Sequence, residues 1–192
     1  MGGPVPSAEC PAIEMAGICK SFGHVRANHN VGFSVRSGEI HALLGENGSG
    51  KSTLMNILCG IYLPDAGSVA VRGRHVAFRS PRDAIAIGIG MVHQHFKLVE
   101  SMTAMENIVA GTGRGLRLDR QQARERIRAF SRRFEMGLDP DKRVHDMSVG
   151  EKQTVEILKV LYRGADILVL DEPTAVLTPQ EIGRLFGILR LM

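Results

Sequence analysis

The chain has 192 residues, a length that suits one ordinary domain or most of a larger one. Hydrophobic residues make up 44% and charged residues 23%, which excludes collagen-like, fibrous and disordered proteins. The longest apolar run, Ala84 to Val92, is far shorter than the ~20 residues that cross a bilayer. A net charge of +4 permits anionic partners without choosing among them.

The first part of the chain is predicted to be rich in strands. Residues 1 to about 11 form an expected flexible leader without a secretory signal. Alternating apolar residues then predict a strand around Ile13 to Ile18, and further strand candidates follow at Val31 to Val35 and Ile40 to Leu44, at Val69 to Val71 and Val76 to Phe78 as a hairpin, and in the run ending at Val92.

Helical patterns dominate beyond residue 100. A helix is expected over 119 to 134, with Asp119 and Gln122 as a capping-box pair, and another from Ser148 to just before Gly164. A short strand, Asp166 to Leu170, precedes a third helix start at Thr178, whose core-facing residues are expected to be Ile182, Leu185, Phe186 and Leu189. This order predicts an α/β domain over 12–192 with a helical subdomain inserted at about 93–146.

Residues Gly45 to Ser52 fit the phosphate-loop pattern G-x-x-x-x-G-K-[ST], between a strand candidate and a helical pattern. Glycines let backbone N–H groups surround phosphate oxygens, Lys51 reaches the β- and γ-phosphates, and Ser52 ligates Mg²⁺. The alternative is a plain glycine turn. The expected nucleotide-binding residues of this segment are Gly45, Asn47, Gly48, Ser49, Gly50, Lys51, Ser52 and Thr53.

The apolar strand that ends at Leu170 is followed by Asp171 and Glu172. Carboxylates at the carboxyl end of a strand in an open α/β sheet are expected to meet the phosphate loop. Asp171 would then hold Mg²⁺, and Glu172 would polarise a water molecule for attack on the γ-phosphate of ATP. Taken alone, the same residues fit a solvated strand end.

With these motifs in this order, the chain resembles the ATP-binding-cassette ATPases, a P-loop NTPase fold with a mainly parallel core sheet, an N-terminal antiparallel part and a helical subdomain. The resemblance implies that Ser148 and Gly150 form the signature motif, which contacts ATP bound to the partner cassette. It also implies that Gln94 orients the metal and the water, and that Phe22 stacks on adenine. Structural roles remain the alternatives, a helix cap for Ser148 and core packing for Phe22.

The resemblance is closest to importer cassettes of the simple-sugar and nucleoside type, on stretches such as Gly90 to Phe96, Val155 to Lys159 and Asp171 to Glu181. It implies a peripheral ATP-binding subunit on the cytoplasmic face of the membrane, using ATP and Mg²⁺. The implied partners are a second cassette, fused or separate, membrane permeases and, indirectly, a solute-binding protein. Met147 and Glu151 depart from the commonest signature sequence.

The chain stops at Met192, before the further strand and switch histidine of such cassettes. We therefore expect a fragment of the first cassette that lacks the C-terminal part of the core, binds nucleotide and hydrolyses it poorly in isolation. Two rival functions remain, a non-hydrolysing nucleotide-binding remnant and a soluble cassette that acts on nucleic acid or ribosomes.

Three other groups of residues are interpreted as structural. The segment from Arg114 to Arg133 holds eight arginines, but these lie opposite an apolar stripe without interleaved aromatic residues, so no nucleic acid is expected. The pair His93 and His95 lacks a third ligand nearby in the sequence. The three cysteines, which show no C-x-x-C spacing, are Cys10, Cys19 and Cys59.

Overall fold

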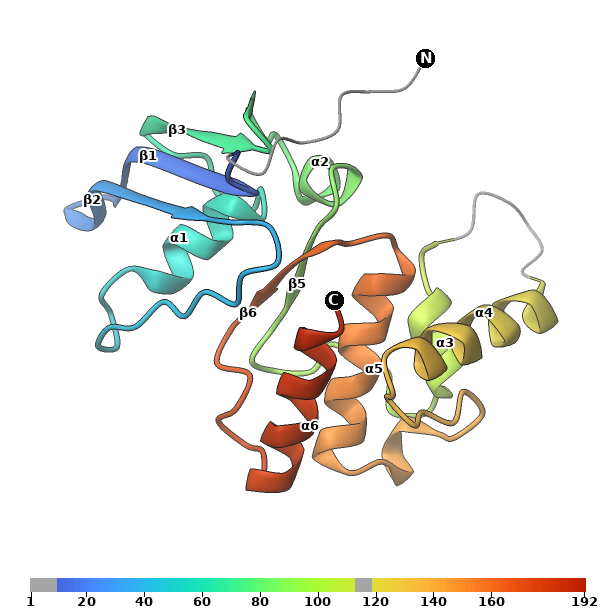
Figure 1. The fold of residues 1–192 in the computed structure, drawn as a ribbon. Coiled ribbons are helices and arrows are strands. Elements are labelled where there is room, and N and C mark those ends of the chain that lie inside the picture. Colours follow the sequence, from blue (N-terminus) through green and yellow to red (C-terminus); the bar gives the residue numbers. More distant parts are fainter. Residues whose placement is uncertain (1–9, 113–118) are drawn as a thin grey trace, which may run out of the picture. The chain divides into compact units, whose positions relative to one another are not determined.

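The computed structural model describes residues 10–112 and 119–192, and the chain divides into an N-terminal unit ending at Ile87 and a C-terminal unit, Gly88–Met192. Figure 1 shows the elements of each unit. Most of the leader expected over 1–11, namely residues 1–9, lies outside the described residues, as do residues 113–118. In the described part of the chain, no helix has the length and apolar character needed to cross a membrane.

An antiparallel sheet forms the N-terminal unit, with strand order β2-β1-β3-β4. Strand β1 (Ile13–Phe22) pairs with both β2 (Val25–Val35) and β3 (Ala66–Val71), and β4 (Arg74–Val76) is at the edge. The β3–β4 turn consists of two residues with positive φ, Arg72 at 50° and Gly73 at 73°, which is the hairpin geometry that matches strand twist. The predicted hairpin is therefore confirmed, with a turn of two residues rather than four.

Two helices complete this unit, α1 (Lys51–Leu58) and α2 (Pro81–Ala86). Helix α1 lies against one face of the sheet (Figure 1). Its Ile57 is buried, as are the sheet residues Met15 and Ile18. These side chains are at most 2% exposed. Met15 and Ile18 are three positions apart, and the register shift between them in β1 breaks the alternation and lets both face the core.

The strand expected over Ile40 to Leu44 does not form. Within the described residues this segment has no ladder partner, and Leu44 is 89% exposed. A parallel strand is stabilised only by hydrogen bonds to neighbouring strands, which its own sequence cannot supply. The prediction of a strand here is therefore wrong for this structure, although the segment still leads directly into the phosphate loop.

The C-terminal unit contains a parallel pair of strands, β5 (Ile89–Val92) and β6 (Ile167–Leu170). Their register places Val92 opposite Leu170, so the carboxyl ends of both strands reach the same edge. Helix α5 (Val149–Tyr162) packs against β5, and Val155 and Leu158 on its inner face are completely buried.

The remaining helices surround α5. They are α3 (Ala104–Val109), α4 (Arg120–Arg133), the 3₁₀ helix η1 (Val144–Asp146) and α6 (Pro179–Arg190). Helix α4 is capped by Asp119, whose carboxylate accepts the N–H of Gln122 at 3.0 Å. In α6 the buried residues are Leu185 and Ile188, whereas Phe186 is 37% exposed. The expectation that Phe186 faces the core is wrong, because it lies about 100° around the helix from Leu185.

Candidate functional site

The phosphate loop lies in the N-terminal unit, immediately before α1. Its Lys51 is the first residue of α1, and the Lys51 Nζ donates hydrogen bonds to the carbonyl oxygens of Gly45 and Glu46, both at 2.7 Å. The ammonium group is therefore folded back over the loop. We expect phosphate oxygens to take over from these carbonyls, because anionic acceptors form stronger bonds to an ammonium group.

The backbone of the loop depends on glycine at two positions. Gly48 has φ +83° and Gly50 has φ +89°, a region that residues with a Cβ rarely adopt. A Cβ at Gly50 would also overlap the carbonyl oxygen of Ala27, and Asn28 Nδ2 donates to the Gly50 carbonyl at 3.2 Å. Glycine at position 50 therefore lets the loop pack closely against β2, which also holds the loop through Asn28.

In the C-terminal unit, the candidate catalytic residues follow the two parallel strands. The N–H of Asp171 donates to the carbonyl of Val92 at 3.1 Å, which extends the strand pairing to the first residue of the acidic pair. Asp171 is half-buried and Glu172 is exposed. Carboxylate and amide oxygens suit Mg²⁺, so Asp171 and Gln94 have donor chemistry that the metal can use.

Gln94 and Glu172 contact each other directly, although 78 positions separate them in the sequence. The Nε2 of Gln94 donates to Oε2 of Glu172 at 2.9 Å. Glu172 has φ +46°, an uncommon value for a residue other than glycine, and such backbone strain is concentrated at functional sites. The contact orients the Glu172 carboxylate and leaves the amide oxygen of Gln94 available to a water molecule or a metal ion.

Ser148 and Gly150, the expected signature-motif residues, lie at the N-terminus of α5 and have partners inside the chain. Ser148 Oγ accepts the N–H of Glu151 at 3.2 Å in a capping box. The N–H of Gly150 donates to the Glu181 carboxylate at 3.0 Å. A phosphate that approaches Gly150 must therefore displace Glu181. Sequence analysis missed this residue, because its capping role on α6 was visible in the pattern but its contact with α5 was not.

The capping box of α5 leads to a pH prediction. The Lys142 ammonium and the N–H of Ser148 hold the pKa of Glu151 below its ordinary value of 4.5. Because the pKa is lowered in the folded state, Glu151 stabilises the fold above about pH 4.5, and this contribution is lost as the pH falls through the lower folded value. We expect the Tm of Glu151→Gln to fall less than that of the wild type below about pH 4.5.

Thermal unfolding followed by circular dichroism across this acidic range checks the prediction. The control is Glu125→Gln, since Glu125 has an exposed hydrogen bond with Gln121 on α4. Parallel Tm curves for the wild type and Glu151→Gln would contradict it.

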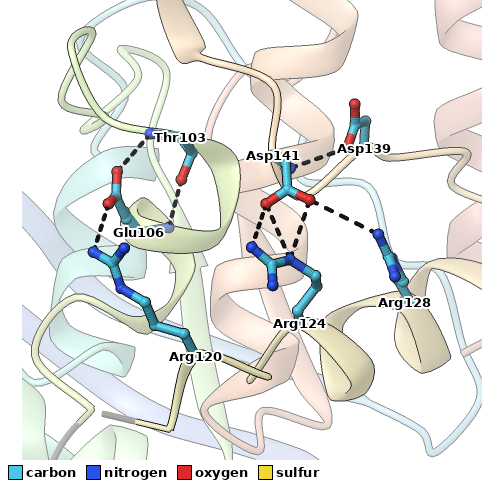
Figure 2. Close-up of polar contacts among 7 residues, drawn as sticks. All are labelled: Thr103, Glu106, Arg120, Arg124, Arg128, Asp139 and Asp141. Carbon is cyan, nitrogen blue, oxygen red and sulfur yellow. Dashed lines mark hydrogen bonds and ion pairs between the residues drawn. The ribbon is translucent and has the colours of Figure 1, made fainter. Parts of the chain in front are cut away.

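Several arginines of α4 have partners within their own unit. Figure 2 shows Arg124 and Arg128 directed at Asp141, and Arg120 at Glu106. Arg124 forms a two-pronged contact with Asp141, with distances of 2.8–3.1 Å, and the Arg126 guanidinium stacks on Tyr162 at 4.4 Å. These arginines tie α4 to neighbouring segments, which supports the interpretation of α4 as a packed helix with a solvated face.

Phe22 is the last residue of β1, and its ring is 43% exposed. It makes an edge-on contact with Tyr62 at 5.2 Å between ring centroids, and Lys20 Nζ lies 5.5 Å from its centroid. The exposed ring has the flat face that adenine stacking requires. Burial does not account for it, so the core-packing alternative is disfavoured.

The cysteines fit the structural interpretation. Cys10, Cys19 and Cys59 are free, and burial raises the pKa of the Cys59 thiol to about 12. The Cys59 thiol is therefore neutral at physiological pH and unsuited to metal binding. Among the described residues, no group of three or more His, Cys, Asp or Glu side chains is placed to hold a metal ion.

The structure thus brings Gln94 and Glu172 together, and Asp171, which precedes Glu172, extends the pairing of β6 with β5. The phosphate loop belongs to the N-terminal unit, and its meeting with the acidic pair across Mg²⁺ stays a prediction. Sequence analysis missed Asn28 and Gln153. The Nε2 of Gln153 donates to the carbonyl of Pro173 at 2.9 Å and supports the loop after Glu172.

The chain is similar in sequence to known ATP-binding proteins of importers. A family model described as ABC transporter matches residues 28–175. The chain is 52% identical over 180 residues to the guanosine import ATP-binding protein NupO of Bacillus subtilis (strain 168), covering 93% of this chain and 35% of that protein. It is 47% identical over 182 residues to the ribose import ATP-binding protein RbsA 1 of Burkholderia thailandensis (strain ATCC 700388 / DSM 13276 / CCUG 48851 / CIP 106301 / E264), covering 93% and 36%.

The chain therefore spans about a third of the length of these curated relatives. Among solved structures, it resembles the ADP conformation of MJ1267, an ATP-binding cassette of an ABC transporter, with a TM-score of 0.84. This match covers 94% of this chain and 76% of that chain at 24% identity, so it concerns the fold. The predicted cassette fold is confirmed.

Proposed function

This chain belongs to the ABC transporter family, and from that premise we propose that it is the ATP-binding part of an importer that takes up nucleosides or simple sugars. The observation that carries the proposal is the contact between Gln94 and Glu172, because it assembles a water-positioning amide and a carboxylate base at the end of two parallel strands. The similarity to NupO and RbsA 1 supports the two substrate classes.

In the proposed reaction, Glu172 accepts a proton from the water that attacks the γ-phosphate, and Gln94 orients both the carboxylate and the water. Lys51 and the backbone of the phosphate loop bind the phosphates, and Ser52 and Asp171 would hold Mg²⁺. When bound, the metal neutralises negative charge that develops on the phosphate oxygens. Phe22 stacks on the adenine.

Cassettes of this family work as dimers with permease subunits. We propose that the chain acts in this way at the cytoplasmic face of the membrane, with a second cassette, permeases and, indirectly, a solute-binding protein. Ser148 and Gly150 would face the ATP of the second cassette. The acidic partners of Arg120, Arg124 and Arg128 favour this proposal over nucleic-acid binding, because these three cations are already paired within the chain.

Calorimetric titration of the purified chain with MgATP tests the nucleotide-binding part of the proposal. We expect saturable heat of binding that disappears when the nucleotide is replaced by adenosine, because the phosphate loop supplies most of the contacts. A properly folded chain that gives no heat with MgATP would contradict the proposal. Retention of permeases, rather than salt-sensitive retention of RNA or DNA, would distinguish the importer from a nucleic-acid ATPase.

A further prediction concerns Glu172, the proposed catalytic base. In the assembled transporter, we expect Glu172→Gln to lower the rate of ATP turnover by about 100-fold or more, with the Kd for MgATP within about twofold of the wild type. The glutamine oxygen can still accept the hydrogen bond from Gln94, so the substitution removes the proton acceptor and keeps the contact. Phosphate release measures the turnover.

The matched control is Glu100→Gln, which neutralises an exposed carboxylate of the same unit, paired with Lys152 at 3.0 Å. We expect this variant to turn over ATP at the wild-type rate. Unchanged turnover by Glu172→Gln would show that another group accepts the proton.

A further inference from the structure

Helix α5 carries an ion pair that contacts the segment after Gln94. Glu156 is only 4% exposed, and its Oε1 accepts the backbone N–H of Lys97 at 2.6 Å. Its Oε2 accepts a hydrogen bond from Lys159 Nζ at 3.2 Å. The same Lys159 Nζ donates to the carbonyl oxygen of Lys97 at 3.0 Å. The pair therefore holds both backbone polar groups of one residue.

Burial of the ion pair between Glu156 and Lys159 is energetically unfavourable compared with burial of apolar side chains. The side chains of Glu156 and Lys159 are 6% and 15% exposed, and they neighbour fully buried residues of α5 such as Val155 and Leu158. Withdrawing two charges from water costs free energy that an apolar pair would not. Simple packing therefore does not account for the pair, whereas fixing the backbone at Lys97 does.

Helix α5 also contacts the loop that follows β6. Gln153, three residues before Glu156, is 5% exposed and donates to the carbonyl of Pro173, the residue after Glu172. Lys97 is three residues after Gln94. One helix thus holds the loops that carry both members of the Gln94–Glu172 contact.

We propose that Gln153, Glu156 and Lys159 form a clamp on α5 that positions Gln94 against Glu172. These are positioning residues, since the clamp acts on the backbone at Lys97 and Pro173 rather than on the nucleotide. The hydrolytic purpose of the clamp rests on the proposed function. The structural consequence of the clamp, an ordered Gln94 amide, does not depend on the proposed function.

Nuclear magnetic resonance of the ¹⁵N-labelled 192-residue chain tests the clamp. The probes are the exchange rate of the Lys97 amide hydrogen and the side-chain amide signals of Gln94, identified by their loss in Gln94→Ala. We expect Glu156→Ala to accelerate Lys97 exchange by about tenfold or more and to move the Gln94 signals toward unstructured values, because both depend on the clamp. Glu156→Gln keeps an oxygen for the Lys97 N–H and should restore part of the protection.

The matched control is Asp141→Asn, which removes a carboxylate from the exposed ion pairs with Arg124 and Arg128 (Figure 2) and should leave both probes unchanged. A folded Glu156→Ala with wild-type Lys97 exchange and Gln94 signals would overturn the proposal. If Glu156→Ala does not fold, Lys159→Met takes its place, with the same expected shift of the Gln94 signals and the same overturning result. Absence of MgATP binding would contradict the proposed function. Lys97 exchange and the Gln94 signals would still test the clamp independently.

Discussion

We expect Lys51→Ala to raise the Kd for MgATP by about 100-fold, equivalent to about 3 kcal/mol, because the substitution removes a charged hydrogen-bond donor from the phosphate loop. In the structure this ammonium group already lies over the loop, bound to the carbonyls of Gly45 and Glu46. To bind phosphate, the ammonium group therefore exchanges its hydrogen-bond partners without moving to a new position. Calorimetric titration of the variant with MgATP measures the loss.

The control for Lys51→Ala is Lys152→Ala, which removes an ammonium group paired with the exposed carboxylate of Glu100. Both variants lose one positive charge, so a general effect of net charge on nucleotide binding would appear in both. We expect the Kd of Lys152→Ala to match the wild type. Equal affinities of Lys51→Ala and the wild type would show that phosphate does not bind at this loop.

The second large effect concerns stability. We expect Gly90→Ala to lower the free energy of unfolding by about 3 kcal/mol, because an added methyl group overpacks a close helix–strand contact. Gly90 lies on β5, and its Cβ would overlap Cγ1 of Val160 on α5 and approach Cβ of Ala165 to 2.9 Å. Urea unfolding followed by circular dichroism measures the change.

The same substitution elsewhere in this unit should have the opposite sign. Gly183 lies within α6, and no neighbouring heavy atom is within 4 Å of its Cβ position. Alanine is favoured over glycine in a helix interior by about 1 kcal/mol, so Gly183→Ala is expected to stabilise the chain. If both variants unfold at the wild-type urea concentration, β5 and α5 are not packed as closely as described.

Where a helix was predicted, local sequence determined its first residue, although α2 and α3 were not predicted. The capping residues Ser148 and Thr178 lie where the pattern predicted, each followed three residues later by a glutamate that completes a capping box. A helix start is defined by bonds within four residues, so the necessary information is contained in the segment itself. The phosphate loop is similar, because the left-handed backbone at Gly48 and Gly50 is possible only for certain residue types.

Each of the six strands among the described residues was indicated by the sequence, which also predicted one strand that does not form. The sequence correctly indicated β5 and β6, which the structure pairs in parallel, and it wrongly predicted a strand over Ile40 to Leu44. The apolar pattern of all three segments is alike. What differs is whether a neighbouring strand supplies hydrogen bonds, and that neighbour is distant in the sequence.

By itself, the sequence identified Gln94, Asp171 and Glu172 as candidates, through their positions at the ends of apolar strands and the resemblance to a family. Only the tertiary structure decided that Gln94 contacts Glu172, that Glu181 occupies the N–H of Gly150, and that Glu156 holds Lys97. These contacts join residues 31 to 78 positions apart. Residue type and local spacing determine a loop or a helix cap, whereas the partner of a side chain is determined by which segments the packing of the core brings together.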